Sequence, residues 1–404
     1  MAIKLQRDGQ QWLYDWMVKE QGKVFHFQPD GRGGLPRTVR AHEMISKHVG
    51  RIALRLMRLG QEEEKAGHKE TALEFYFDAS TAFGHAQHIV FENNSEKQFL
   101  HGTSIKAYDK VRELSPYPIE HVDVPWGDKI ISGNFHLLPD RRKAPVVIFI
   151  TGCDATKEMF PHPFYNYAHQ RGMHILAIDG VGQGESNLRG YKVTPDSYEQ
   201  CTSAVIDYLL TRDEVDADNI GVFGLSFGSF WSTRVASYDH RIKACVSPWA
   251  SICDKYYLMN EESPRYKQLF SYLTGAKSEA ELDEITGRMA MDELMPKITC
   301  PILFTIGEYD PRSPLQEIYR LFDLVKAPKE LWVYEDQHHM ASIAGAADAM
   351  TVWRFDTHPF MFDWLRERFE GQPLRHDGQP VYVRTGGGSP NGPDASTSTE
   401  WFNP

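Results

Sequence analysis

The first candidate for chemistry is a serine between two glycines, in the segment Gly224-Leu225-Ser226-Phe227-Gly228. This G-x-S-x-G pattern follows an apolar run and precedes residues that can form a helix, the setting of a sharp strand-to-helix turn. Glycines on both sides leave room for the tight backbone, so the serine hydroxyl stands clear of it. We therefore expect Ser226 to be a nucleophile and the N–H of Phe227 to point into the same site.

A candidate acid follows the β-rich run 302–306. A serine hydroxyl attacks only when a base takes its proton, and the base needs an acid to orient it. Asp310 lies just past the end of this run and is followed by a proline, which suits a rigid loop at the edge of a sheet. We assign the acid to Asp310, with Glu308 as the alternative.

A candidate base follows the next β-rich run, 330–334. Two adjacent histidines, His338 and His339, stand a few residues after it, downstream of the acid. A short turn normally separates the strand from the catalytic histidine, which favours His339 and leaves His338 as the alternative. The chain order serine, acid, histidine is that of one known type of triad. The sequence thus predicts a triad of Ser226, Asp310 and His339.

An acyl-transfer site also needs two N–H donors for the developing oxyanion. Phe227 supplies one, and the loop after the run 146–150 is the expected source of the other. We assign it to the Cys153 N–H, with that of Asp154 as the alternative. Cys153 as a thiol nucleophile is disfavoured because it lacks a glycine-flanked turn. The charged residues of this loop are expected to contact substrate: Asp154, Lys157 and Glu158.

Residues 1–117 are the expected N-terminal helical domain, with helical periodicity from Ala41 to about Leu114. Apolar residues step by three and four from Met44 to Leu59, and Gly60 is expected to end that run. A second run, 72–90, repeats the spacing with small residues, so the two could form a helix hairpin. An aromatic-rich segment, Trp12 to Met17, packs on its own domain or contacts a second subunit.

Residues 118–370 show a different pattern, in which short β-rich runs alternate with helical ones. This alternation predicts an α/β fold with an eight-stranded, mostly parallel sheet and helices on both faces. The expected helices are 197–210, 315–325 and 359–369. The expected strands are 119–124, 129–137, 146–150, 174–179, 219–224, 243–247, 302–306 and 330–334.

Two segments fall outside this alternation. Residues 250–295 separate two strands and are helical in pattern, so we expect a lid over the site, with Tyr256 and Tyr257 contacting substrate. Residues 371–404 are rich in Gly, Pro, Ser and Asn and are expected to be a flexible tail.

Composition excludes several classes of protein. The 404 residues carry 44 basic and 55 acidic side chains, a net charge of −11, which disfavours nucleic acid or an anionic membrane as partner. No run approaches the ~20 apolar residues of a membrane-spanning helix. The five cysteines form no CxxC pairs, so neither a disulfide framework nor a zinc site is indicated. We expect a cytoplasmic, homodimeric enzyme that acts on a small molecule without metal or cofactor.

The segments around Ser226, Asp310 and His339, with Asp179-Gly180-Val181-Gly182-Gln183-Gly184-Glu185-Ser186, resemble α/β-hydrolases. The Gly152–Glu158 loop and the helices before the core resemble the group that contains 2,6-dihydropseudooxynicotine hydrolase and the Yg1-type polyketide-shortening hydrolases. This resemblance implies a site between helical domain and core, and cleavage of carbon–carbon bonds beside a carbonyl. It also implies an extra acid near the lid, for which the candidates are Asp254, Glu261 and Glu262.

The expected reaction is hydrolysis by an activated serine, with the bond type left open. Ester and carbon–carbon cleavage share the attack on a carbonyl and differ in the leaving group. A carbanion leaves only when it is stabilised as an enolate and protonated on carbon, so the substrate would be bulky and ketonic or polyketide-like. The alternatives are a carboxylic ester hydrolase with the same triad, and a non-catalytic hydrolase-like binding or regulatory protein.

Overall fold

The computed structural model describes residues 39, 41–341, 343, 355–384, 389–392 and 395–396. The aromatic segment from Trp12 to Met17 lies outside these residues. In the described part of the chain, ten strands form one sheet in the order β1-β2-β4-β3-β5-β6-β7-β8-β9-β10. No helix there is long and apolar enough to cross a bilayer. The strands are β1 (Ile119–Trp126), β2 (Lys129–His136), β3 (Ala144–Ile150), β4 (His174–Asp179), β5 (Val215–Gly224), β6 (Ala244–Ser247), β7 (Ile302–Gly307), β8 (Lys329–Tyr334), β9 (Pro380–Val383) and β10 (Ala395–Ser396).

The sheet is parallel from β4 to β9 and antiparallel at both ends. β1 and β2 form a hairpin, β2 pairs antiparallel with β4, and β10 pairs antiparallel with β9. The central strands are rich in buried Val, Ile, Leu and Phe, as in sheets covered by helices on both sides. The eight expected strands are all present, and two more follow them.

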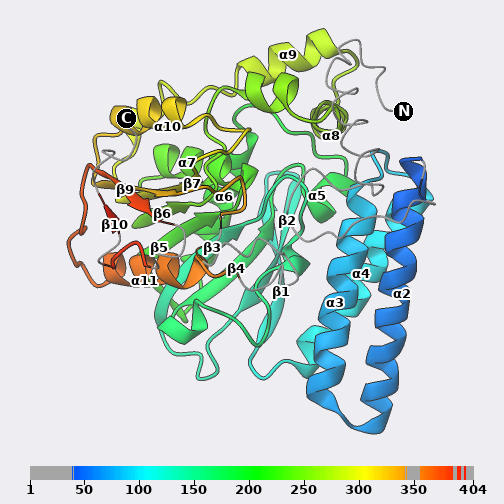
Figure 1. Cartoon of the computed structure of the whole chain (residues 1–404). Helices are drawn as coiled ribbons and strands as arrows, with labels where there is room; N and C mark the ends of the chain where they lie inside the picture. Colours follow the sequence, from blue (N-terminus) through cyan, green and yellow to red (C-terminus); the bar gives the residue numbers. More distant parts are fainter. Residues whose placement is uncertain are drawn as a thin grey trace.

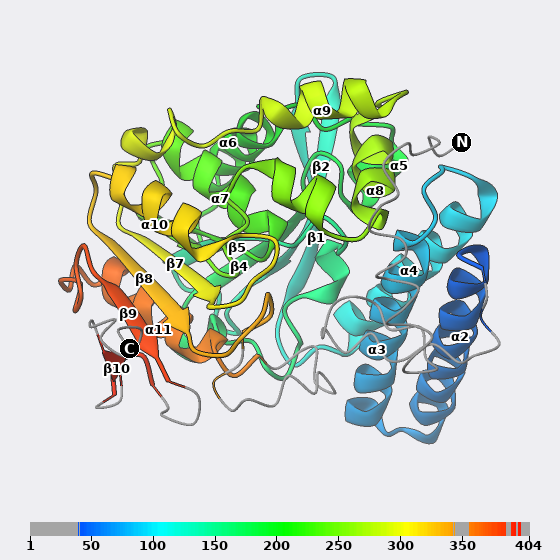
Figure 2. The same ribbon diagram turned by 45° about the horizontal axis from the view of Figure 1, so that its top comes forward.

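Helices cover both faces of this sheet (Figures 1 and 2). One face carries α6 (Ser197–Leu209), α7 (Phe227–Tyr238) and α10 (Leu315–Leu324), and the other carries α11 (His358–Phe369). Phe223 of β5 stacks on Phe362 of α11 with ring centroids 4.9 Å apart, which shows how closely the second layer packs. Because the central strands are parallel, their carboxyl ends lie along one edge of the sheet, and the expected site residues follow these ends.

Three helices stand beside the β1–β2 edge: α2 (Glu43–Ala66), α3 (Lys69–His88) and α4 (Ser95–Leu114) (Figure 1). The expected end of the first helix at Gly60 is wrong, because α2 continues for six more residues to Ala66. A Cβ at Gly60 would lie 2.9 Å from the Tyr76 ring, so this glycine allows α2 and α3 to approach closely. Tyr108 of α4 hydrogen-bonds His136 of β2, 3.0 Å away, and joins the helices to the sheet.

The insertion after β6 contains α8 (Arg265–Thr274) and α9 (Glu279–Gly287), preceded by a π-helical turn at Tyr257–Glu261. It reaches the helical layer, since the Arg265 guanidinium lies 3.3 Å from the His88 ring nitrogen and the Tyr272 hydroxyl bonds Asn93. A lid-like segment thus bridges the two parts of the molecule.

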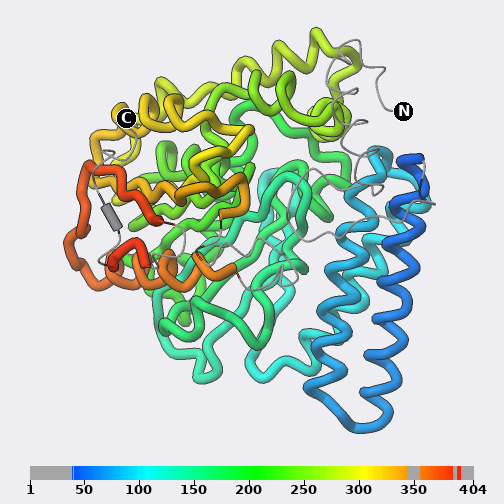
Figure 3. The backbone as a smooth tube through the Cα atoms, in the orientation of Figure 1, coloured from blue at the N-terminus to red at the C-terminus, as the bar shows by residue number. Residues whose placement is uncertain are grey.

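The expected tail differs from the structure at residues 380–383. Figure 3 traces the chain from α11 back to the sheet, where β9 pairs in parallel with β8. Val381, Tyr382 and Val383 are almost fully buried. Three β-prone residues are enough to extend the sheet here, because β8 offers a free edge with an apolar surface on each face.

Candidate active site

Ser226 occupies the sharp turn between β5 and α7. Its backbone has φ 55° and ψ −122°, a conformation that costs energy for any residue with a side chain. The glycines on either side of Ser226 allow neighbouring backbone segments to approach this turn closely. A Cβ at Gly224 would lie 2.1 Å from the carbonyl of Gly228, and one at Gly228 would lie 2.5 Å from the Ile150 carbonyl. The turn thus holds the serine in a strained position at the carboxyl end of the strand.

The structure brings Ser226, His339 and Asp310 together in a chain of hydrogen bonds. Ser226 Oγ lies 2.7 Å from His339 Nε2, and His339 Nδ1 lies 2.6 Å from Asp310 Oδ2. The second oxygen of Asp310 accepts the backbone N–H of Arg312 at 3.0 Å. His339 is 3% exposed, and burial, aided by the Arg312 charge and opposed by Asp310, lowers its pKa. The imidazole is therefore neutral at neutral pH and can accept the serine proton.

The two alternative residues have other partners. The Glu308 carboxylate accepts the backbone N–H of Asp336 at 3.0 Å, and burial raises its pKa. His338 is exposed, and its Nδ1 lies 3.2 Å from the Tyr309 carbonyl. Both residues support the turn that carries His339.

Backbone amides of two segments lie next to the serine. Phe227 is the first residue of α7, so its N–H has no acceptor within the helix. The loop after β3 passes close by, since a Cβ at Gly152 would lie 3.5 Å from that of Ser226. Cys153 follows directly and is buried, and the role of its N–H as an oxyanion donor stays a prediction.

The 151–158 loop is held near both ends by the loop 179–185. At the first end, the Gln183 side-chain amide donates to the carbonyls of Thr151, at 2.9 Å, and Gly152, at 2.8 Å. The Tyr198 hydroxyl donates a hydrogen bond to the side-chain oxygen of Gln183 at 2.5 Å. The backbone next to Cys153 is thereby fixed by a side chain from a different loop.

At the second end stands a buried ion cluster, which we call the Lys157 cluster. The Lys157 ammonium lies 3.1 Å from Asp179 and 2.7 Å from Glu185, and it also contacts Glu158. These three carboxylates raise the pKa of Lys157. Lys157 and Glu158 are each 1% exposed, so the structure places them in the interior and not on a surface open to substrate.

The three carboxylates of this cluster form the acidic group best arranged for a metal in the described chain. Their oxygens lie within 4.8 Å of one another. The Lys157 ammonium already stands among them, in the position that a cation would take. The arrangement is that of a buried ion network.

The lid contributes a second charged pair near the triad. Of the three candidate lid acids, Glu262 is the buried one at 2% exposed, and its Oε1 lies 4.0 Å from Nε of Arg312. Arg312 is 5% exposed, and its Cζ lies 5.2 Å from the centre of the Tyr266 ring. Sequence reasoning missed Arg312, and its only signal was its place two residues after the predicted acid.

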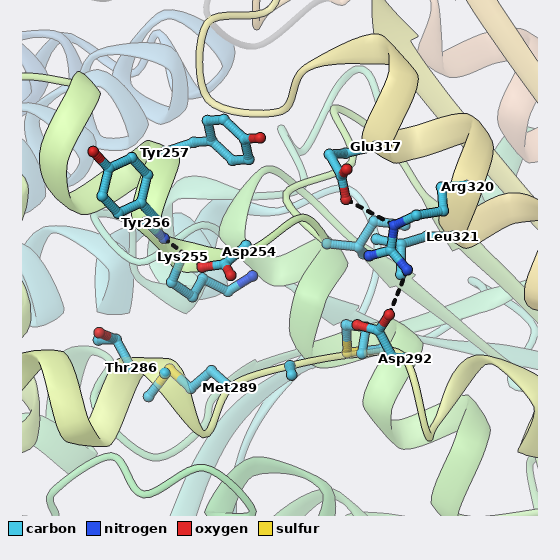
Figure 4. Close-up of a pocket in the computed structure, with 14 residues that line it drawn as sticks. Asp254, Lys255, Tyr256, Tyr257, Thr286, Met289, Asp292, Glu317, Arg320 and Leu321 are labelled. Carbon is cyan, nitrogen blue, oxygen red and sulfur yellow. Dashed lines mark hydrogen bonds and ion pairs between the residues drawn. The ribbon is translucent and has the colours of Figure 1, made fainter.

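Tyr256 and Tyr257 line a separate cavity of about 240 Å³ between the lid and α10 (Figure 4). Asp254 lies beside them, and Arg320, paired with Glu317 and Asp292, closes the far side. The described lining residues include none of the triad. Tyr256 is 57% exposed. Tyr256, Tyr257 and Asp254 thus share a cavity of their own, and their contact with substrate stays a prediction.

Comparison with known proteins gives a family. A family model described as "Esterase FrsA-like" matches residues 53–286, more than half of the chain. The chain belongs to the FrsA-like esterase family.

Its relatives are hydrolases. It is 28% identical to 2,6-dihydropseudooxynicotine hydrolase of Paenarthrobacter nicotinovorans over 72% of this chain and 78% of that protein. It is 30% identical to the α/β-hydrolase xenA of Xenoacremonium sinensis over 79% of this chain and 86% of that one. The crystal structure of 2,6-dihydroxy-pseudo-oxynicotine hydrolase superposes with a TM-score of 0.70 at 24% identity, covering 84% and 92% of the two chains. This FrsA-like protein is an α/β-hydrolase enzyme, and the resemblance read from its motifs is confirmed.

Proposed function

We propose that this protein is a serine hydrolase in which Ser226 is the nucleophile, His339 the base and Asp310 the orienting acid. The observation that carries the proposal is the chain of two hydrogen bonds from Ser226 through His339 to Asp310, each with a donor–acceptor distance shorter than 2.8 Å. The strained turn at Ser226 supports it, because such strain persists where the surrounding structure holds a functional group in place.

The steps follow from this geometry. His339 Nε2 takes the proton of Ser226 as Oγ adds to a substrate carbonyl carbon, and Asp310 stabilises the imidazolium that forms. The N–H groups of Phe227 and Cys153 donate to the oxyanion, each worth about 3–4 kcal/mol in other enzymes. The imidazolium protonates the leaving group, and water then releases the acyl group from Ser226 by the reverse route.

We further propose that the bond broken is a carbon–carbon bond beside a carbonyl in a bulky ketonic substrate. The similarity to 2,6-dihydropseudooxynicotine hydrolase over most of both chains supports this proposal. So does the buried Glu262 beside Arg312, since burial raises the Glu262 pKa and favours its proton-bearing form. An ester hydrolase is the second candidate, because the matching family model is that of an esterase.

A fluorophosphonate probe tests the nucleophile. We expect it to label the wild-type protein at Ser226, and to leave Ser226→Ala unlabelled and inactive. Ser203→Ala, which removes a serine of α6 bonded to Asp239, is the matched control and is expected to label normally. A wild-type protein that neither labels nor hydrolyses an activated ester would favour a non-catalytic binding protein.

Product analysis tests the bond type. With 1-phenylbutane-1,3-dione, carbon–carbon hydrolysis gives a carboxylic acid and a methyl ketone in equal amounts. Turnover of 4-nitrophenyl acetate without any cleavage of the diketone would instead establish the esterase alternative.

A further inference from the structure

Arg312 is a buried cation whose position is fixed relative to the triad. Its backbone N–H donates to Asp310 at 3.0 Å, so the two residues share one rigid turn. Asp310 in turn bonds His339 Nδ1 at 2.6 Å, and the Arg312 charge contributes to lowering the pKa of His339. The side chain extends toward the lid, where Glu262 and Tyr266 are its neighbours.

This guanidinium has more hydrogen-bonding capacity than the described chain uses. Arg312 Nε makes no hydrogen bond, and neither does Glu262 Oε1, although both atoms are buried. Their separation of 4.0 Å exceeds hydrogen-bond length. A buried charge is normally paired and hydrogen-bonded, because burying it otherwise costs several kcal/mol. An arrangement with a strained nucleophile nearby and an unused buried donor indicates a group kept for a ligand.

The proposed reaction has a place for such a donor. After Ser226 adds to one carbonyl of a 1,3-dicarbonyl substrate, the carbon–carbon bond breaks and its electron pair moves onto the second carbonyl. The leaving fragment is then an enolate, with its negative charge mainly on oxygen. His339 returns the proton taken from Ser226 to the enolate carbon, which gives the ketone, and water hydrolyses the acyl group left on the serine.

We propose that Arg312 is a specificity-determining residue that binds the second carbonyl oxygen of a 1,3-dicarbonyl substrate and stabilises the enolate that leaves. Glu262 lies on the lid side of the guanidinium, 4.0 Å from its Nε, and limits its movement before substrate binds. This inference rests on the proposed carbon–carbon cleavage. It assigns the substrate class by chemistry: a carbonyl compound with a second carbonyl two carbons away.

The test compares two substrates on Arg312→Met at pH 8, where His339 is neutral in every variant. For 1-phenylbutane-1,3-dione we expect kcat/KM to fall by about 100-fold or more, the usual cost of losing one donor to a developing oxyanion. For 4-nitrophenyl acetate, whose leaving group needs no such help, we expect a change of less than about threefold. Arg312→Lys keeps the charge and is expected to lose less diketone activity than Arg312→Met.

The matched control is Arg265→Met. Arg265 lies over the same Tyr266 ring, with its Cζ 4.7 Å from the ring centre, but it faces His88 in the helical layer. We expect this variant to keep both activities. The melting temperature of Arg312→Met should fall little, because the buried Nε of Arg312 has no hydrogen bond to lose.

Three results would overturn the inference: no loss on the diketone, an equal loss on both substrates, or a lower melting temperature accompanied by both losses. The second and third would make Arg312 a support for the triad or the fold. A wild-type protein that labels at Ser226 but cleaves no diketone refutes the proposed bond type before any variant is compared. The failure of the proposed function is thus separate from the failure of this inference.

Discussion

Replacing Lys157 by methionine should destabilise the protein strongly, and the loss should depend on pH. The ammonium is 1% exposed and stands among Glu158, Asp179 and Glu185. Without it, carboxylates within 4.8 Å of one another would repel by about 3.5 kcal/mol per pair at an effective dielectric constant of about 20. Arg189 lies 3.1 Å from Glu185 and partly neutralises its charge, so the remaining repulsion is mainly between Glu158 and Asp179.

That pair avoids the repulsion by binding one proton in the folded state wherever the pH makes the proton cheaper than the repulsion. A carboxyl with an ordinary pKa of about 4 gains a proton at a cost of 1.36 kcal/mol per pH unit above that value. The cheaper of the two responses sets the loss, so the expected destabilisation is about 3.5 kcal/mol at pH 7.5, where both carboxylates stay charged, and about 2 kcal/mol at pH 5.5, where one of them binds a proton. The sign follows from linkage: the carboxyl pKa is higher in the folded variant than in its unfolded chain, so stability relative to wild type falls as pH rises.

Urea unfolding of wild type and Lys157→Met at the two pH values measures this difference. The matched control is Lys110→Met, because Lys110 also meets two glutamates, Glu64 at 3.1 Å and Glu113 at 2.7 Å, but on the surface. Exposed pairs contribute less than about 1 kcal/mol, so the control should lose little at either pH. The reasoning is refuted if the two variants lose the same amount, or if the Lys157→Met loss does not shrink on acidification.

Two further predictions concern catalysis. Since burial lowers the pKa of His339 below its ordinary 6.5, the acid limb of log kcat/KM against pH should have its midpoint below 6.5; a midpoint above it would contradict a buried neutral base. Gln183→Glu replaces the amide donor to the 151–158 loop by a carboxylate that repels two carbonyls, so kcat should fall by about 10- to 100-fold with little change in KM. Gln200→Glu, an exposed substitution on α6, is its control, and equal rates in the two variants would show that the loop does not depend on Gln183.

Local sequence patterns were enough to locate eight of the ten described strands and the residues that meet at Ser226. The eight expected strands are present because each is a short β-rich run bounded by turn residues. Asp310 and His339 could be chosen because the carboxyl ends of neighbouring parallel strands, β7 and β8, necessarily lie side by side. The order of the strands thus brings residues that are distant in the sequence close together in space.

Burial and long-range pairing could not be predicted in the same way. Lys157 and Glu158 look like ordinary loop charges, and their placement depends on Asp179 and Glu185, more than twenty residues away. Arg312 gives no periodic signal, because its neighbour Glu262 comes from the lid insertion. Gly60 looked like a helix end, and only the approach of the Tyr76 ring explains why α2 passes through it.

Strand β9 supports the turn that leads to His339, although the two are far apart in the sequence. The carbonyl of Val383 accepts the N–H of Glu335 at 3.0 Å, at the start of the turn that leads to His339. The Tyr382 hydroxyl bonds that of Tyr319 and ties the same strand to α10, which follows the Asp310 turn. A stretch whose composition predicts a tail therefore supports both the turn that leads to His339 and the helix that follows the Asp310 turn, so substitutions at residues 380–383 should shift the positions of these two side chains.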